Sequence, residues 1–179
     1  MMTKSEMKAL VRYAIDSRSM CRLYFRYHYY YVHCFPLAAS DRLFLSAMQD
    51  DFLINGFSIR RFRDMTKIVF NDDRRNEILR AEGIIDGISV PDVELEDWHG
   101  VFLSLQAMGK NVIVERESRN EDEELFFIGR IEKVLKSKVL FRSFDADGIW
   151  DEEPEAIPFS QITTVTFGSR YVEVFSKYV

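Results

Sequence analysis

The sequence predicts a mostly β protein, α+β by content, built from two tandem copies of one unit: a short helix followed by a strongly bent, five-stranded antiparallel barrel. Three observations predict this fold. The chain matches itself when it is shifted by 97 positions, each matching half opens with an amphipathic helical pattern, and short alternating runs separated by turn residues follow. We expect copy one over residues 1–84, a linker over 85–94, and copy two over 95–179.

The internal match is ungapped between residues 40–70 and 137–167, where 8 of 31 positions are identical. Unrelated sequences would share about two. Upstream the offset becomes 89, which pairs Leu23 with Val112, because copy two carries a longer acidic loop at 117–124. Surface hairpins tolerate such insertions well. The alternative, two unrelated helices that precede two unrelated sheets, does not explain the ungapped match.

Copy one begins with a helix, since its apolar residues recur at helical spacing from Met7 to Ile15. Alternating runs then predict five strands, and Asn55-Gly56 has the composition of a turn. A small five-stranded sheet buries a core only if it curls into a barrel. A further helix is expected from Asp72 to Gly83. The expected strands of copy one are 21–27, 29–37, 42–48, 52–59 and 65–70.

Copy two repeats this order, with a helix from Trp98 to Leu105 and a turn at Asp145–Gly148. Its last residues, 168–178, alternate in polarity and predict an extra C-terminal strand. Such a strand needs a partner: the edge of its own barrel, the other copy or a second molecule. We therefore expect a homo-oligomer formed through a sheet edge. The expected strands of copy two are 111–117, 125–134, 138–144, 148–150 with 156–158, and 162–167.

A helix that leads into a five-stranded bent barrel resembles the Sm-like fold, an SH3-type small β-barrel. Copy one is more specifically similar to the WYL domain of bacterial regulators. The matching segments are the helix and first strand over 10–27, Leu43-Phe44-Leu45 where the family has Trp-Tyr-Leu, and 57–68 where it reads Arg-x-Phe-Arg-Leu-x-Arg-Ile. Only about 20 residues precede the barrel, so we do not expect the DNA-binding winged helix that usually precedes a WYL domain.

The resemblance implies a sensor of nucleotides or single-stranded nucleic acid that binds through a basic groove. It extends to the basic positions that match the family, which are Arg26, Arg60, Arg63 and Lys67. Tyr24 is added because guanidinium groups near tyrosine rings can hold phosphates while the rings stack on bases. The alternative is a solvated strand face, or a set of salt bridges to the acidic second half.

Charge is distributed unevenly along the chain. Residues 1–95 hold 14 Lys and Arg against 13 Asp and Glu, whereas residues 96–179 hold 10 against 16. Non-specific affinity for nucleic acid comes mainly from neutralised phosphates. Any nucleic-acid site is therefore expected in the first half.

No catalytic motif, cofactor site or metal site is expected. His28, His33 and Cys34 lack the second ligand cluster of a zinc site, and Asp145–Glu155 lacks the order of a calcium loop. Cys21 and Cys34 are expected to be reduced packing residues. No apolar run reaches the roughly 18–20 residues that span a bilayer, and the N-terminus has the composition of a cytoplasmic protein.

The composition and motifs favour a non-catalytic adaptor that acts through protein–protein contacts. The first alternative is the nucleotide or single-stranded nucleic-acid sensor, working through copy one. The second is a hydrolase with an acid–base pair hidden among the 29 carboxylates, which we do not expect.

Overall fold

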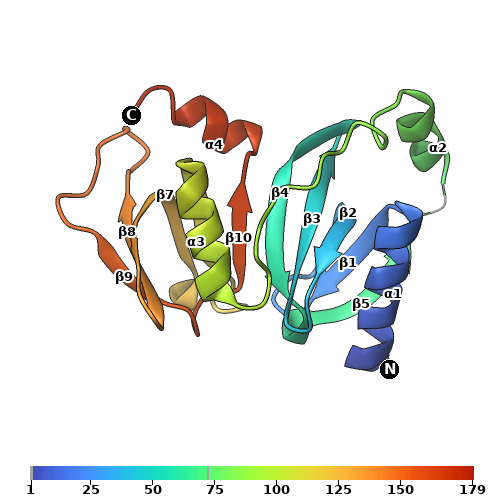
Figure 1. The fold of residues 1–179 in the computed structure, drawn as a ribbon, viewed down its shortest axis with the longest axis horizontal. Helices are drawn as coiled ribbons and strands as arrows, with labels where there is room; N and C mark the ends of the chain where they lie inside the picture. Colours follow the sequence, from blue (N-terminus) through green and yellow to red (C-terminus); the bar gives the residue numbers. More distant parts are fainter. Residues whose placement is uncertain (1, 72) are drawn as a thin grey trace. The chain divides into compact units, whose positions relative to one another are not determined.

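The computed structural model describes residues 2–71 and 73–179. The chain divides into two compact units, Met1–Pro91 and Asp92–Val179, here called unit 1 and unit 2. Strands dominate both units, and each contains two α-helices (Figure 1). The expectation of a mostly β, α+β fold is confirmed.

Unit 1 opens with α1 (Lys4–Ser17), which is longer than the expected 7–15 because its N-terminus is capped. The Thr3 hydroxyl accepts a hydrogen bond from the Glu6 backbone N–H at 3.2 Å, and the Glu6 carboxylate accepts one from the Thr3 N–H at 2.7 Å. The helix ends at Arg18, whose φ is +48°. One stripe of the helix packs into the core, formed by Met7, Val11 and Ala14.

Five antiparallel strands follow in the spatial order β5-β1-β2-β3-β4, and a short 3₁₀ turn, η1 (Phe62–Asp64), joins the last two in sequence. The α1 side of the sheet holds a core that includes Leu23, Phe44 and Met65. The strands agree with the sequence expectation to within a few residues. Their bounds are β1 Cys21–Phe25, β2 Tyr31–Ala39, β3 Leu43–Asp50, β4 Leu53–Arg61 and β5 Met65–Phe70.

The turn between β3 and β4 lies at Asp51-Phe52, whose φ values are +42° and +64°. These values are typical of a two-residue hairpin turn. The turn expected at Asn55-Gly56 is wrong: these residues lie inside β4, where the register with β3 shifts. Gly56 has a φ of +77°, a conformation that favours glycine, and it lies at the β-bulge where the register shifts.

The other face of the unit 1 sheet is partly covered by α2 (Arg74–Ala81) and the segment after it. Leu79 and Ile85 pack on Met20, Phe35 and Ala47. The expected helix is confirmed over residues 74–81; residue 72, its expected first residue, lies outside the described residues. Because α2 and the segment after it cover only part of this face, the rest of the face stays exposed, and the candidate site lies there.

Unit 2 has the same order of elements, with α3 (Trp98–Met108) before five antiparallel strands ordered β10-β6-β7-β8-β9. The expected stretch 148–150 forms only a bridge between Phe144 and Trp150. A 3₁₀ turn, η2 (Glu121–Glu123), lies in the long acidic loop. The bounds are β6 Val112–Arg116, β7 Leu125–Val134, β8 Lys138–Ser143, β9 Glu155–Pro158 and β10 Thr164–Phe167.

The expected C-terminal strand is wrong, because residues 170–175 form a helix, α4 (Arg170–Phe175). Gly168 leaves β10 with a φ of +65°, and the Ser169 hydroxyl caps the helix by accepting from the Val172 N–H at 3.4 Å. Val172 and Phe175 then pack on the unit 2 sheet. The homo-oligomer was expected because an unpaired C-terminal strand would need a second strand beside it. Since residues 170–175 are helical, that reason no longer applies.

The sheets are open, and the expected closed barrels are not confirmed. In unit 1 the residues between β4 and β5 form η1, after which β5 pairs with β1. Strands β5 and β4 therefore stand first and last in the order, and in unit 2 the same is true of β10 and β9. No helix within the described ranges has the length and apolar character needed to cross a lipid bilayer.

The two units correspond, but not at one constant offset. The Phe62 N–H donates to the Arg42 carbonyl at 3.0 Å, and the Phe159 N–H donates to the Ser137 carbonyl at 3.0 Å. Phe62 therefore corresponds to Phe159 at an offset of 97, whereas Arg42, just before β3, corresponds to Ser137, just before β8, at an offset of 95. The match between the two units is thus not ungapped, as the sequence had suggested. A slip of two residues keeps every side chain on its original face, so the hydrophobic pattern did not reveal it.

The first strands also differ from the sequence match. Cys21 pairs with Phe70, and Val112 pairs with Phe167. Because Phe70 corresponds to Phe167, Cys21 corresponds to Val112, and the offset is 91 rather than 89. Leu23 was expected to match Val112, and this alignment is wrong by two residues.

Candidate functional site

Two of the four basic residues expected to bind a ligand, Arg26 and Arg63, instead lie near Asp64, a buried carboxylate at the end of η1. Arg61 donates through Nε to Asp64 Oδ2, and Arg26 Nη2 lies 2.7 Å from Asp64 Oδ1. Arg63 Nε lies 3.9 Å from the same oxygen. The Tyr27 hydroxyl also donates to Asp64 Oδ1 at 3.0 Å. Paired in this way, Arg26 and Arg63 belong to an ion network within unit 1.

Arg60 is also withdrawn from the surface. It is 9% exposed, and its guanidinium carbon lies 4.5 Å from the centre of the Phe25 ring. Arg60 therefore packs over an aromatic ring of the sheet. Asp64, the carboxylate that lies near both Arg26 and Arg63, belongs to the same unit as these two arginines.

A different surface brings cations and aromatic rings together on the exposed part of the β5-β1-β2 face. Lys67 and Tyr24 are register partners, and the Lys67 ammonium lies 5.2 Å from the centre of the Tyr24 ring. Tyr24 pairs in turn with Tyr31, with ring centres 5.5 Å apart. The Arg22 guanidinium lies 5.2 Å from the Tyr31 ring. Each tyrosine thus has a cation at its side, in a row across three strands.

His33 continues this row towards α2. Its ring centre lies 5.0 Å from that of Tyr31, and its Nε2 accepts a hydrogen bond from Arg22 Nε at 3.2 Å. Arg75 Nη1 lies 3.4 Å from His33 Nδ1. Burial lowers the pKa of His33, and the nearby Arg75 and Arg22 guanidinium groups lower it further. A neutral ring is therefore favoured between the two guanidinium groups.

We call this set the cation–aromatic surface: Arg22, Tyr24, Tyr31, His33, Lys67 and Arg75. One of its three cations, Arg22, lies 3.4 Å from the Asp73 carboxylate. Tyr31 is 40% exposed, and the adjoining hairpin adds Tyr30, which stacks on His28 with ring centres 4.8 Å apart. The arrangement offers positive charge and open ring faces together, as sites for single-stranded nucleic acid do.

Unit 2 has no such surface at the corresponding positions. The Arg22–His33 pair of unit 1 corresponds to the Ile113–Ile128 pair of unit 2, and Val172 of α4 packs on those isoleucines. The Tyr24–Tyr31 pair corresponds to Glu115 and Phe126. The position of the basic Arg22–His33 pair of unit 1 is therefore apolar and covered in unit 2, whereas Phe126 is 55% exposed.

Of the residues expected from the sequence to bind a ligand, the structure places Tyr24 and Lys67 together. Sequence reasoning missed Arg22, His33 and Arg75. The alternation of Arg22 with Tyr24 and of Tyr31 with His33 was a signal for the strand residues, since alternate residues share a face. Arg75 gave no such signal, because it reaches His33 from a helix.

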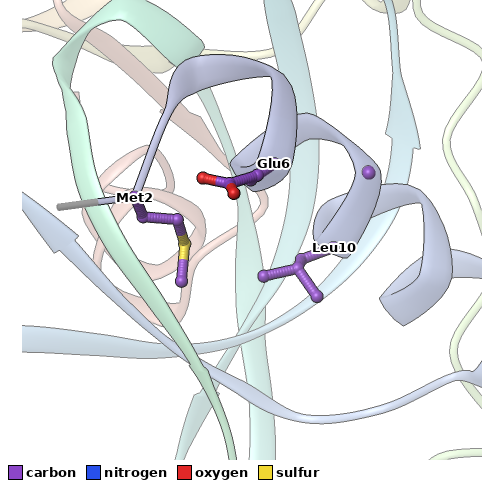
Figure 2. Close-up of a pocket in the computed structure, with 4 residues that line it drawn as sticks. Met2, Glu6 and Leu10 are labelled. Carbon is purple, nitrogen blue, oxygen red and sulfur yellow. The ribbon is translucent and has the colours of Figure 1, made fainter.

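A hollow of about 550 Å³ lies beside the N-terminal turns of α1, lined by Met2, Glu6, Ala9 and Leu10 (Figure 2). Its one carboxylate, Glu6, already serves the helix cap through Thr3. The hollow is therefore a largely apolar surface feature with no acid–base pair.

Within residues 2–71 and 73–179, no three His, Cys, Asp or Glu side chains cluster in a way that could hold a metal ion. The Asp145 carboxylate, considered above for calcium, accepts hydrogen bonds from the N–H groups of Asp147 and Ile149 at 2.9 Å. It thus shapes its own turn.

Comparisons with known proteins give no relative: no protein family matches the chain, and neither a curated protein nor a solved structure is significantly similar to it.

Proposed function

We propose that unit 1 binds single-stranded nucleic acid through the cation–aromatic surface, and that the protein acts by binding rather than by catalysis. The observation that carries this proposal is the row across three strands in which Lys67 lies over the Tyr24 ring and the Tyr24 ring lies beside that of Tyr31. The rings would stack on bases, and the cations would contact phosphates. A free nucleotide carries the same groups and is a separate outcome of the test.

The proposal requires cations that can exchange partners. Lys67 is on the exposed part of the sheet, and its contact in unit 1 is a ring face that a base could also use. Arg22 pairs with Asp73 at 3.4 Å, where the Asp73 side chain is 46% exposed. Ion pairs this open to solvent contribute little to stability, so a phosphate can replace them at small cost.

Fluorescence anisotropy with a labelled single strand of about 12 nucleotides tests the proposal. We expect binding that weakens with salt, and Tyr31→Ala to weaken it about tenfold through lost stacking. Lys67→Ala should reduce the slope of log affinity against log salt by about 0.7. Arg12→Ala is the matched control, since Arg12 is an exposed cation on α1 of the same unit and should leave the slope unchanged.

Absence of binding at low salt would overturn the proposal. So would an equal loss of slope in Arg12→Ala and Lys67→Ala, because binding would then follow net charge and not this surface. Tighter binding of a mononucleotide than of the single strand would identify a nucleotide sensor instead.

A second candidate is the adaptor role expected from the composition. The observation that favours it is a group of exposed apolar side chains at the C-terminus of unit 2: Tyr171, Val174 and Tyr178 are 58%, 42% and 79% exposed. Exposed aromatic side chains are common at protein interfaces. Loss of a partner's binding in Tyr178→Ala, with Lys67→Ala unaffected, would favour the adaptor over the sensor.

We propose that each unit is an Sm-like module and that unit 1 is WYL-like. A helix followed by five antiparallel strands in the same spatial order in both units supports this. A tandem of closed barrels and a cytoplasmic location stay predictions, and so does the homo-oligomer, which sedimentation velocity at high concentration would test.

A further inference from the structure

Arg75 and His33 face each other at the α2 end of the cation–aromatic surface as two hydrogen-bond donors. His33 Nε2 accepts a hydrogen bond from Arg22 Nε at 3.2 Å, so in a neutral ring the other nitrogen, Nδ1, carries the proton. Arg75 Nη1 lies 3.4 Å from this Nδ1, and a guanidinium group only donates. An acceptor that approached both groups would therefore be bound by two donors at once.

The open part of this sheet face ends at the same place. Tyr31, His33 and Phe35 alternate along β2 and share one face. Tyr31 is 40% exposed, whereas Phe35 is 1% exposed and packs with Leu79 of α2. His33 therefore stands at the boundary where α2 begins to cover the face. A single strand that stacks on Tyr31 and runs towards α2 has to leave the sheet or end at this boundary.

We infer that the nucleic-acid site binds the end of a strand, and that Arg22, His33 and Arg75 hold its terminal phosphate. The inference rests on the proposed function. A terminal phosphate monoester carries about 1.5 to 2 negative charges near pH 7, whereas a phosphate within the strand carries one. One of its oxygens would accept from His33 Nδ1–H and Arg75 Nη1, and another from the Arg22 guanidinium. The terminal base would then stack on Tyr31, whose ring centre lies 5.0 Å from that of His33.

An acidic side chain already lies at this end of the surface. The Asp73 carboxylate lies 3.4 Å from Arg22 Nη2 and accepts a hydrogen bond from the Arg75 backbone N–H at 3.0 Å, as the cap of α2. Its side chain is 46% exposed, so water screens its charge and weakens its competition with a phosphate. Arg75 is exposed as well, so its guanidinium is open to a ligand from solvent.

The test uses three single strands of one sequence, each of about 12 nucleotides, as unlabelled competitors for the full-length protein. One carries a 5′-phosphate, one a 3′-phosphate and one only hydroxyl ends. We expect a phosphate at one of the two ends to tighten binding about tenfold through charge-assisted hydrogen bonds. The strand that shows this effect also gives the direction in which the nucleic acid lies on the sheet.

Arg75→Ala should abolish the difference between the phosphorylated and the hydroxyl-ended strand. Arg74→Ala is the matched control and should keep the difference. Arg74 is the preceding residue of the same helix, equally a cation, and it pairs with Glu77 at 2.6 Å on the exposed side of α2.

The outcomes separate the two proposals. Salt-dependent binding in which neither terminal phosphate changes the affinity overturns the end-binding role and leaves the proposed function standing. The same follows if Arg75→Ala keeps the full difference, or if Arg74→Ala and Arg75→Ala lose it equally, because the phosphate would then respond to net charge alone. If no strand binds at low salt, the proposed function fails as well. The comparison of the three strands on the wild type does not depend on any variant folding.

Discussion

Arg61 and Asp64 form an ion pair that is buried on both sides, with side-chain exposures of 8% and 3%. The pair is three residues apart in sequence, and η1 turns the chain so that the guanidinium meets the carboxylate. Arg61 also donates to the Tyr27 hydroxyl at 3.0 Å, which ties the β1–β2 hairpin loop to the end of β4. The most basic segment of the sequence is therefore largely structural.

This arrangement predicts a large cost for removing the shared carboxylate. Asp64→Asn should lower the free energy of unfolding by about 3 kcal/mol, because it leaves the buried Arg61 charge uncompensated. Urea denaturation measures the loss. Asp41→Asn, at an exposed carboxylate that pairs with Arg12 at 3.1 Å, is the control and should cost under about 1 kcal/mol. Equal losses in both variants would contradict the structural role of Asp64.

The environment of His33 predicts a dependence of stability on pH. Its pKa in the folded protein is lowered, first by burial and then by Arg75 and Arg22, so the unfolded chain binds this proton more readily. Stability should therefore fall as the pH falls below the unfolded value of about 6.5. Urea unfolding between pH 5 and 7.5 should show a smaller decrease for His33→Asn than for the wild type. Parallel curves for the two proteins would contradict this.

The two cysteines predict slow thiol chemistry. Cys21 and Cys34 are register partners, free and buried, as the sequence predicted for packing residues. Burial raises the pKa of Cys34 to about 12 and raises that of Cys21 further. Because the thiolate is the reactive form, both thiols should resist a disulfide reagent at pH 8 in native buffer and react at once in denaturant. Rapid labelling of the native protein would contradict this burial.

The strands could be predicted because alternation and turn composition are properties of short segments of sequence. In β1, for example, Leu23 lies in the core and the next residue, Tyr24, lies on the opposite face. The register between strands is not local. A slip of two residues in β3 left every face unchanged, so neither the offset of 95 nor the pairing of Arg22 with His33 could be read from the sequence.

The candidate site was only partly predictable for a related reason. Lys67 was found because it matches a basic position of the WYL family that copy one resembles, and Tyr24 because tyrosine rings near guanidinium groups can stack on bases. Arg26 and Arg63 were assigned to a ligand because nothing in the sequence shows that Asp64 is buried among them. Charge density along a chain indicates where cations are, but the burial of their partners determines whether a ligand can use them.

The C-terminal segment offers a test that separates helix from strand. In a strand Val172 and Val174 would share one face, so truncating either would cost a similar amount. In α4 they point in different directions: Val172 is buried against Ile113 and Ile128, whereas Val174 is 42% exposed. Val172→Ala should therefore lower the free energy of unfolding by about 2 kcal/mol through lost burial and the cavity left behind.

The matched change Val174→Ala should cost under about 0.5 kcal/mol, since it removes the same two methyl groups from an exposed position. Thermal or urea denaturation of the full chain measures both losses. Equal losses would restore the C-terminal strand, and with it the argument that this edge pairs with a second molecule. A larger loss of stability in Val172→Ala than in Val174→Ala would mean that α4 covers the unit 2 sheet at Ile113 and Ile128. The open surface of the Arg22–His33 pair is then specific to unit 1, because unit 2 uses the same register position as core.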